Sequence, residues 1–209
     1  MNATTPESRG AHPGHLLSGS RTGAAPMPGA RPLTIPEAGK FLRATTGVFA
    51  GSAAVERLAL LVGLRPSEIA DLAHQGHVER RGLRWYVTVV GGKCPRTIAV
   101  AQLVGDALQD LADGRLHQHG PLHAPLPRYV TSGRVVDHLG AALEDAGFGG
   151  ASVYAIHGFL LEQLPRVVDP VRAYAYLGVV GTSASGLPAG WDIEVAGLID
   201  QHFGALIGN

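Results

Sequence analysis

The sequence has little of three features that mark common classes of protein. It contains one cysteine, Cys94, which excludes a disulfide framework and a multi-thiolate metal cluster. No apolar run approaches the roughly 20 residues of a membrane span, and the N-terminus has no apolar signal core. We therefore expect a cytoplasmic protein with no membrane segment.

Charge is scarce and evenly balanced. Only 16% of the residues are charged, and the 17 basic and 17 acidic side chains give a net charge of zero. A protein that binds nucleic acid usually has a basic surplus, because phosphate neutralisation supplies much of the affinity. Residues 34–112 hold nine basic and seven acidic side chains (+2), whereas residues 113–209 hold five and nine (−4). Any DNA-binding surface is therefore expected on the first half.

The 209 residues suffice for one domain with a single core and a tail. Residues 1–32 are rich in Pro, Gly, Ser and Thr and have almost no aliphatic pattern, so we expect a disordered tail. Residues 33–209 are expected to form the folded domain.

The patterned segments predict a mostly helical α+β domain. Two β-rich segments, 83–90 and 96–100, flank Gly91-Gly92 and predict a small antiparallel hairpin. Apolar residues at helical spacing predict helices at about 34–45, 53–61, 66–73, 101–112, 133–146, 153–164, 170–177 and 193–207.

Two motifs in the first half of the sequence resemble those of a known protein family. The run Leu60–Leu72 contains Gly-Leu-Arg-Pro-Ser-Glu-Ile, in which the arginine is Arg65, and Gly91–Val100 places Lys93 on the hairpin turn. The chain resembles tyrosine recombinases and phage integrases here. That resemblance implies an integrase-like catalytic domain, with Arg65 at the first catalytic arginine and Lys93 at the turn lysine. The family's separate core-binding domain is not found in these residues.

Arg65 and Lys93 also have a chemistry that does not depend on the resemblance. An arginine at a helix start and a lysine on a hairpin tip are both suited to hold phosphate oxygens. The alternatives are an Arg65 side chain paired with Glu68 or Asp71, and a solvated Lys93.

The second half departs from the family's pattern. In the helix expected at 153–164, His157 can align with a family histidine, but Ile156 or Leu160 then stands at the second arginine. Val179 replaces the histidine of a Leu-Gly-His motif, and no tyrosine follows Tyr176. The family transfers a phosphoryl group to a tyrosine hydroxyl, and losing one cationic donor costs a factor of roughly 10² to 10³.

The resemblance therefore implies a degenerate, inactive member in which Arg65, Lys93 and His157 are relic positions. By itself, a histidine such as His157 on an apolar helix is expected to be a satisfied core residue.

No metal or cofactor is expected. Three histidines, His117, His119 and His123, lie near Asp113, but no cysteine or further carboxylate completes a zinc site, so we expect a polar loop. The glycine-rich stretches 147–150 and 178–190 lack a phosphate-loop lysine.

Three hypotheses for function follow. The first is a non-catalytic protein that binds double-stranded DNA in a regulatory or architectural role. Its DNA contacts would be basic residues of the first half: Arg65, Lys93, Arg96, Arg80, Arg81 and Arg84.

The second hypothesis is an interaction scaffold that forms a homo-oligomer or binds another protein. The family exchanges C-terminal helices between subunits, and the amphipathic segment 191–207 resembles such a helix; alternatively, it packs on its own core. The third is an active recombinase with a displaced nucleophile at Tyr154, Tyr174 or Tyr176.

Overall fold

The computed structural model describes residues 31–45, 50–72, 77–91, 94–119, 131–179 and 181–208. The tail expected over residues 1–32 lies almost wholly outside these ranges. The helices are α1 (Ile35–Thr45), α2 (Ala50–Arg57), α3 (Pro66–Asp71), α4 (Gln102–His119), α5 (Ser132–Asp145), α6 (Tyr154–Gln163), α7 (Pro170–Leu177), α8 (Trp191–Phe203) and α9 (Ala205–Gly208). A π-helical turn (Leu58–Val62) extends α2, and a 3₁₀ turn (Leu164–Arg166) extends α6.

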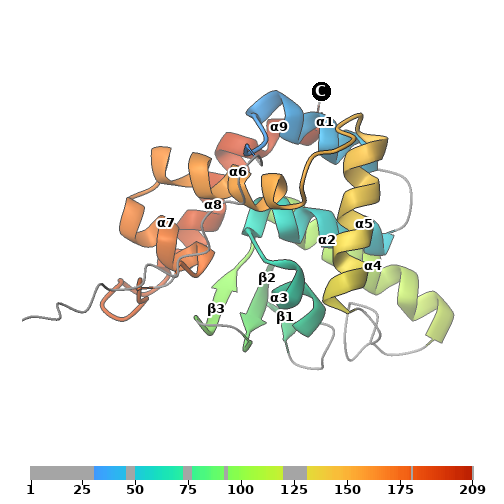
Figure 1. The fold of residues 1–209 in the computed structure, drawn as a ribbon. Helices are drawn as coiled ribbons and strands as arrows, with labels where there is room; N and C mark the ends of the chain where they lie inside the picture. The colour runs from blue at the N-terminus through green and yellow to red at the C-terminus, as the bar shows by residue number, and fades with distance from the viewer. Residues whose placement is uncertain are drawn as a thin grey trace, which may run out of the picture.

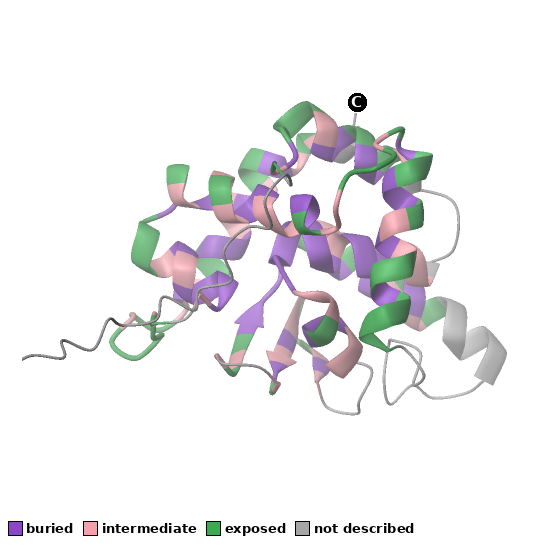
Figure 2. Ribbon diagram, viewed as in Figure 1, coloured by how far each residue is buried: buried purple, intermediate pink, exposed green. Residues whose placement is uncertain are grey.

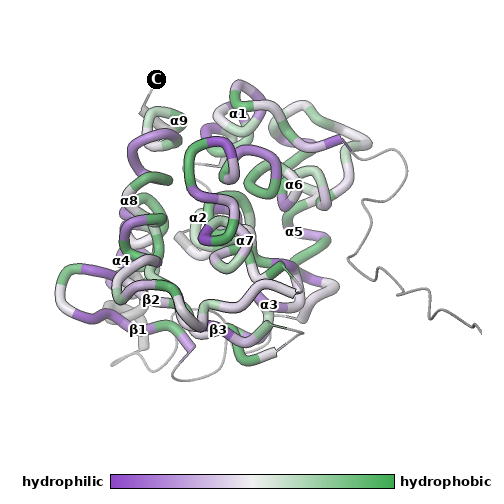
Figure 3. Tube along the Cα trace, turned by 90° about the vertical axis from the view of Figure 1, so that its left-hand side faces the viewer, coloured by the Kyte–Doolittle hydropathy of each residue, from purple (hydrophilic) through white to green (hydrophobic). Residues whose placement is uncertain are grey.

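The three strands, β1 (Val78–Arg81), β2 (Arg84–Val89) and β3 (Arg96–Ala99), form an antiparallel sheet in the order β1-β2-β3. Arg81 pairs with Arg84 at one end of this meander, and Val89 pairs with Arg96 at the other. The sheet lies along one edge of the helical body, at the bottom of both Figure 1 and Figure 3. Its two turns therefore lie at opposite ends of β2.

The centre of the core is the π-helical turn. Its five consecutive apolar residues, Leu58–Val62, are all buried, as the central helix in Figure 2 shows. A helix that is apolar on all sides is stable only when neighbours surround it. Gly63 ends the turn with φ +70°, and a Cβ there would lie 2.5 Å from Cδ2 of Leu177. Glycine at this position lets the segment that leads to Arg65 approach the end of α7.

The predicted fold class is confirmed: the domain is mostly helical with a small antiparallel sheet. Two local predictions were wrong. The hairpin has a third strand, β1, whose polar sequence Val-Glu-Arg-Arg is paired only on its β2 side and has no apolar alternation. Helix α4 continues to His119 instead of ending near Ala112, so the polar loop does not begin at Gly114. No helix in the described ranges is long and apolar enough to cross a membrane.

The C-terminal segment 191–207 packs on the chain's own core. Helix α8 buries Val195, Ile199 and Phe203, and the Phe203 ring meets Phe159 edge-on at 5.4 Å between centroids. The Asp200 carboxylate accepts a hydrogen bond from the backbone N–H of Gln102 at the start of α4 (2.8 Å). The sequence left two alternatives open for this segment, exchange between subunits and packing on its own core. The apolar face of α8 packs on its own core.

We predict that Phe203→Ala lowers the free energy of unfolding by about 3–5 kcal/mol, because it leaves a cavity between α6 and α8. Denaturant unfolding followed by circular dichroism measures the change. His202→Ala, which alters the exposed neighbouring residue, is the control and should change little. A midpoint that rises with protein concentration would instead show that a second copy covers this face.

Candidate functional site

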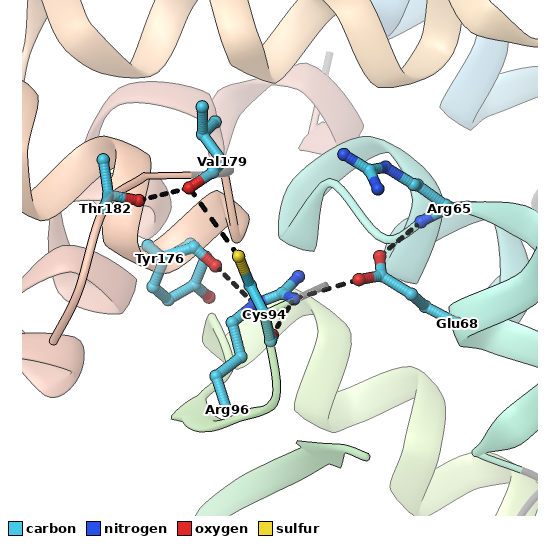
Figure 4. A network of polar contacts seen from close by, with 7 residues as sticks. All are labelled: Arg65, Glu68, Cys94, Arg96, Tyr176, Val179 and Thr182. Carbon is cyan, nitrogen blue, oxygen red and sulfur yellow. Dashed lines mark hydrogen bonds and ion pairs between the residues drawn. The ribbon is translucent and has the colours of Figure 1, made fainter. Parts of the chain in front are cut away.

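The candidate site lies where four segments converge: the start of α3, the start of β3, helix α6 and the end of α7. They contribute Arg65 and Glu68, Arg96, and the backbone of Tyr176 to Val179, which Figure 4 shows, and His157 from α6. These segments are far apart in sequence, so the tertiary fold assembles the site.

Arg65 precedes the first turn of α3 in an extended conformation (φ −74°, ψ 155°). Pro66 follows at the first helical position, where its fixed φ and missing N–H are tolerated. The backbone N–H of Arg65 donates to Oε2 of Glu68 at 2.9 Å. Its half-buried guanidinium donates to no described residue. The alternative in which the Arg65 side chain pairs with Glu68 or Asp71 was therefore wrong.

Glu68 instead pairs with Arg96. Nη1 of Arg96 lies 3.0 Å from Oε1 of Glu68, and the two side chains are only 6% and 8% exposed. Arg96 also donates through Nε to the carbonyl oxygen of Tyr176 (3.0 Å) and through Nη1 to that of Cys94 (3.3 Å). One arginine thus joins β3, α3 and the end of α7.

Gly178 allows this arrangement. It ends α7 in the left-handed region with φ +65°, and a Cβ there would lie 2.3 Å from Nη1 of Arg96. A side chain at this position would collide with the Arg96 guanidinium. The next residue, Val179, accepts hydrogen bonds at its carbonyl oxygen from the hydroxyl of Thr182 (2.6 Å) and the thiol of Cys94 (3.8 Å).

His157 faces this cluster from α6. Burial lowers its pKa below the ordinary 6.5, and the positive charge of Arg65 lowers it further. Nδ1 of the ring is buried and has no hydrogen-bond partner in the described part of the chain. A backbone hydrogen bond to Gly63 acts in the opposite direction and raises the pKa, so the expectation of a satisfied core histidine is met in part.

The tyrosines considered as displaced nucleophiles lie in different surroundings. Tyr176 is fully buried, its hydroxyl donates to the carbonyl oxygen of Ala99 (2.9 Å), and burial raises its pKa further above 10. Tyr154 is 54% exposed and Tyr174 is half-buried. The Tyr176 hydroxyl is thus engaged as a structural donor to the sheet.

The structure does not bring all the predicted basic residues together. Arg80, Arg81 and Arg84 lie at the β1–β2 turn, whereas Arg96 lies at the other end of β2. Six residues of strand separate these ends, a distance of about 17 Å at the usual rise per residue. The first-half arginines therefore form two groups.

The turn arginines have partners of their own. Arg80 donates to Oε1 of Gln109 (3.0 Å), and Arg81 pairs with Glu79 and lies over the Tyr86 ring at 4.8 Å. The Arg84 side chain has no hydrogen-bond or ion-pair partner among the described residues. This end of the sheet is basic but partly neutralised.

Several predicted residues lie outside the description. Lys93 is one, and so are His123 and the side chains of His117 and His119. Within the described ranges no three potential ligands come together as a metal site. The sequence analysis missed Glu68 and Gly178 as parts of the site. A buried carboxylate three residues after Arg65 signals a charged partner, but not which one.

We predict that Tyr176→Phe lowers the free energy of unfolding by about 1–3 kcal/mol, because the buried carbonyl of Ala99 loses its donor. Thermal and denaturant unfolding measure the change. Tyr154→Phe, at an exposed position, is the matched control and should behave as wild type. Equal stability of Tyr176→Phe and wild type would contradict the structural role of this hydroxyl.

We also predict that His157 titrates below pH 6.5 in an NMR pH series. Arg65→Ala should raise the His157 pKa, because it removes a nearby positive charge, whereas Arg166→Ala on the exposed surface should not. A His157 pKa at or above 6.5 would contradict the burial of this ring beside Arg65.

Comparisons with known proteins bear on the fold. No protein-family model and no curated protein matches the sequence. Among solved structures, the chain is similar to XerA recombinase (TM-score 0.59, 16% identity, covering 78% of this chain and 62% of that chain). It is also similar to XerH site-specific recombinase bound to palindromic difH substrate in a post-cleavage complex (TM-score 0.57, 13% identity, 82% and 49%).

A pre-cleavage complex of XerH with difH substrate matches with a TM-score of 0.53 and 14% identity, over 85% of this chain and 53% of that one. The chain thus spans about half to three-fifths of the length of these recombinases. At such low identity the likeness concerns the fold. The protein has a tyrosine-recombinase-like, integrase-like α+β fold.

Proposed function

We propose that the protein is a cytoplasmic, non-catalytic DNA-binding protein with a regulatory or architectural role. The observation that carries this proposal is the half-buried Arg65 guanidinium, which has no acceptor among the described residues. A planar guanidinium with free donors is well suited to bind a phosphate group. The similar XerH structures were solved with DNA substrates, which supports the choice of DNA as the source of that phosphate.

The non-catalytic part of the proposal rests on the second half of the chain. Ile156 and Leu160, at the two positions that the resemblance gives to a second arginine, are both fully buried apolar residues. The hydroxyl of Tyr176, the last tyrosine of the sequence, is bonded to the Ala99 carbonyl. This combination favours binding without phosphoryl transfer to a tyrosine.

We assign the principal contact to the end of the sheet near Arg65 and Arg96, together with Lys93, which lies outside the described residues. The group of Arg80, Arg81 and Arg84 at the other end is a second proposed contact. A duplex that contacts both groups of arginines has to run along the length of β2. The acidic residues 113–209 are expected to lie away from the DNA, since like charges repel.

The proposal predicts that the protein binds mixed-sequence duplex DNA and that salt weakens the binding. Fluorescence anisotropy across a salt series measures both. Arg65→Ala should weaken binding about tenfold and reduce the slope of log K against log salt by about 1, because one phosphate contact is lost. Lys93→Ala should weaken binding as well.

Arg166→Ala is the matched control, because this arginine is exposed and, among the described residues, pairs with Glu162 in the acidic half. It should bind DNA as wild type does. Absence of binding even at low salt would refute the DNA proposal and favour the interaction scaffold. A covalent protein–DNA adduct that survives denaturing electrophoresis would refute the non-catalytic part.

A further inference from the structure

The turn between β1 and β2 is a short, exposed projection of the sheet. Arg81 and Arg84 are its last paired residues, so Gly82 and Leu83 form a two-residue turn. Gly82 has φ +62°, and a Cβ there would meet no described atom within 4 Å. The turn therefore stands clear of the rest of the domain, and Figure 3 shows it projecting at the edge of the molecule beside the labels of β1 and β2.

An apolar side chain occupies the tip of this turn. Leu83 is 83% exposed, the highest value for any large apolar side chain in the described ranges. The position after glycine in a two-residue hairpin turn is ordinarily taken by Asn, Asp or Ser. Leucine gains nothing from burial here in the free protein. Its apolar surface is therefore available to a partner.

The charges beside the tip favour an anionic partner. Arg81 and Arg84 stand directly opposite each other across the two strands, so their side chains share one face of the sheet, where like charges repel. The Arg84 side chain has no partner among the described residues, and Arg81 pairs with the exposed Glu79. Because an exposed ion pair is weak, an anion can displace it. An anion close to both arginines relieves their repulsion.

Neighbouring contacts hold the turn in place before any partner binds. On the other face of the sheet, Nε of Arg80 donates to the carbonyl oxygen of Gly82 (3.1 Å), and its Nη1 donates to Oε1 of Gln109 on α4 (3.0 Å). The Arg81 guanidinium lies over the Tyr86 ring, 4.8 Å from its centroid. An ordered turn loses less conformational entropy on binding than a free loop does.

Two kinds of anionic partner also accept an apolar side chain, a lipid surface and a nucleic acid duplex. A lipid surface is the poorer fit, because a leucine buries far less apolar surface than a myristoyl chain, which by itself gives only marginal membrane binding. The minor groove of DNA is about 6 Å wide and receives leucine wedges between base steps, with basic side chains on the flanking phosphates.

We propose that the β1–β2 turn is a minor-groove wedge, in which Leu83 enters the groove of a DNA duplex and Arg81 and Arg84 bind the phosphates beside it. This inference rests on the proposed function. The turn lies about 17 Å from Arg96 along β2, which is half of a helical turn of roughly 34–36 Å. A duplex that runs along β2 thus presents its major groove at one end of the strand and its minor groove at the other.

The first experiment measures binding of a mixed-sequence duplex by anisotropy across a salt series. Leu83→Ala should bind about tenfold more weakly, because an apolar contact is lost. The slope of log K against log salt should stay the same, because no phosphate contact is lost. Arg84→Ala, by contrast, should lower both affinity and slope.

Two further variants control for the size and position of the side chain. Leu83→Met keeps an apolar side chain of similar volume and should bind as wild type does. Val171→Ala is the matched control, since Val171 is an exposed apolar residue (54%) in the acidic half of the chain, and it should also bind as wild type does. Circular dichroism establishes that each variant is folded.

The second experiment measures the shape of the bound duplex, because a wedge kinks DNA. Resonance energy transfer between dyes on the two ends of the duplex should rise when wild type binds. With saturating Leu83→Ala it should stay near the value of free DNA. A reduced salt slope for Leu83→Ala, or an unchanged bend, would contradict the wedge.

The outcomes separate this inference from the proposed function. If wild type binds duplex and Arg65→Ala weakens it, while Leu83→Ala binds and bends DNA as wild type does, the inference fails and the proposed function stands. If wild type binds no duplex, both fail. Vesicles of phosphatidylcholine and phosphatidylserine test the lipid alternative: vesicle binding that Leu83→Ala abolishes, without duplex binding, overturns the wedge in favour of a lipid contact.

Discussion

The buried pair of Arg96 and Glu68 is the interaction on which the geometry of the site depends. The arginine joins β3 to the carbonyl at the end of α7, and the carboxylate joins it to the backbone of Arg65. Breaking such a pair leaves an uncompensated buried charge, which destabilises a protein strongly. The pair therefore fixes the position of Arg65 relative to the sheet, and any ligand that Arg65 binds meets a preorganised backbone.

Two glycines make that geometry sterically accessible. Gly63 lets the residues before Arg65 pass Leu177, and Gly178 lets the Arg96 guanidinium lie against the end of α7. Both adopt positive φ, which a residue with a Cβ rarely does. The π-helical turn Leu58–Val62 supports them from within the core. Packing at the centre of the domain is thus coupled to the position of the site at its edge.

In the site of this recombinase-like fold, some polar groups have hydrogen-bond partners and others do not. Tyr176 and Glu68 are hydrogen-bonded to neighbours, whereas the Arg65 guanidinium and Nη2 of Arg96 have no partner among the described residues. Bonded groups stabilise the fold, and unsatisfied donors favour an anionic ligand.

The sequence by itself determined the helical pattern, the hairpin and the start of α3 at Arg65, because caps, apolar spacing and Gly-Gly act over a few residues. It did not determine β1, whose residues 78–81 become a strand only by pairing with β2. Nor could it assign the partner of Glu68: Arg65 is near in sequence, but Arg96, 28 residues away, is near in space. Only the tertiary structure decided that the Tyr176 hydroxyl faces Ala99, since contacts between distant segments depend on how the whole core packs.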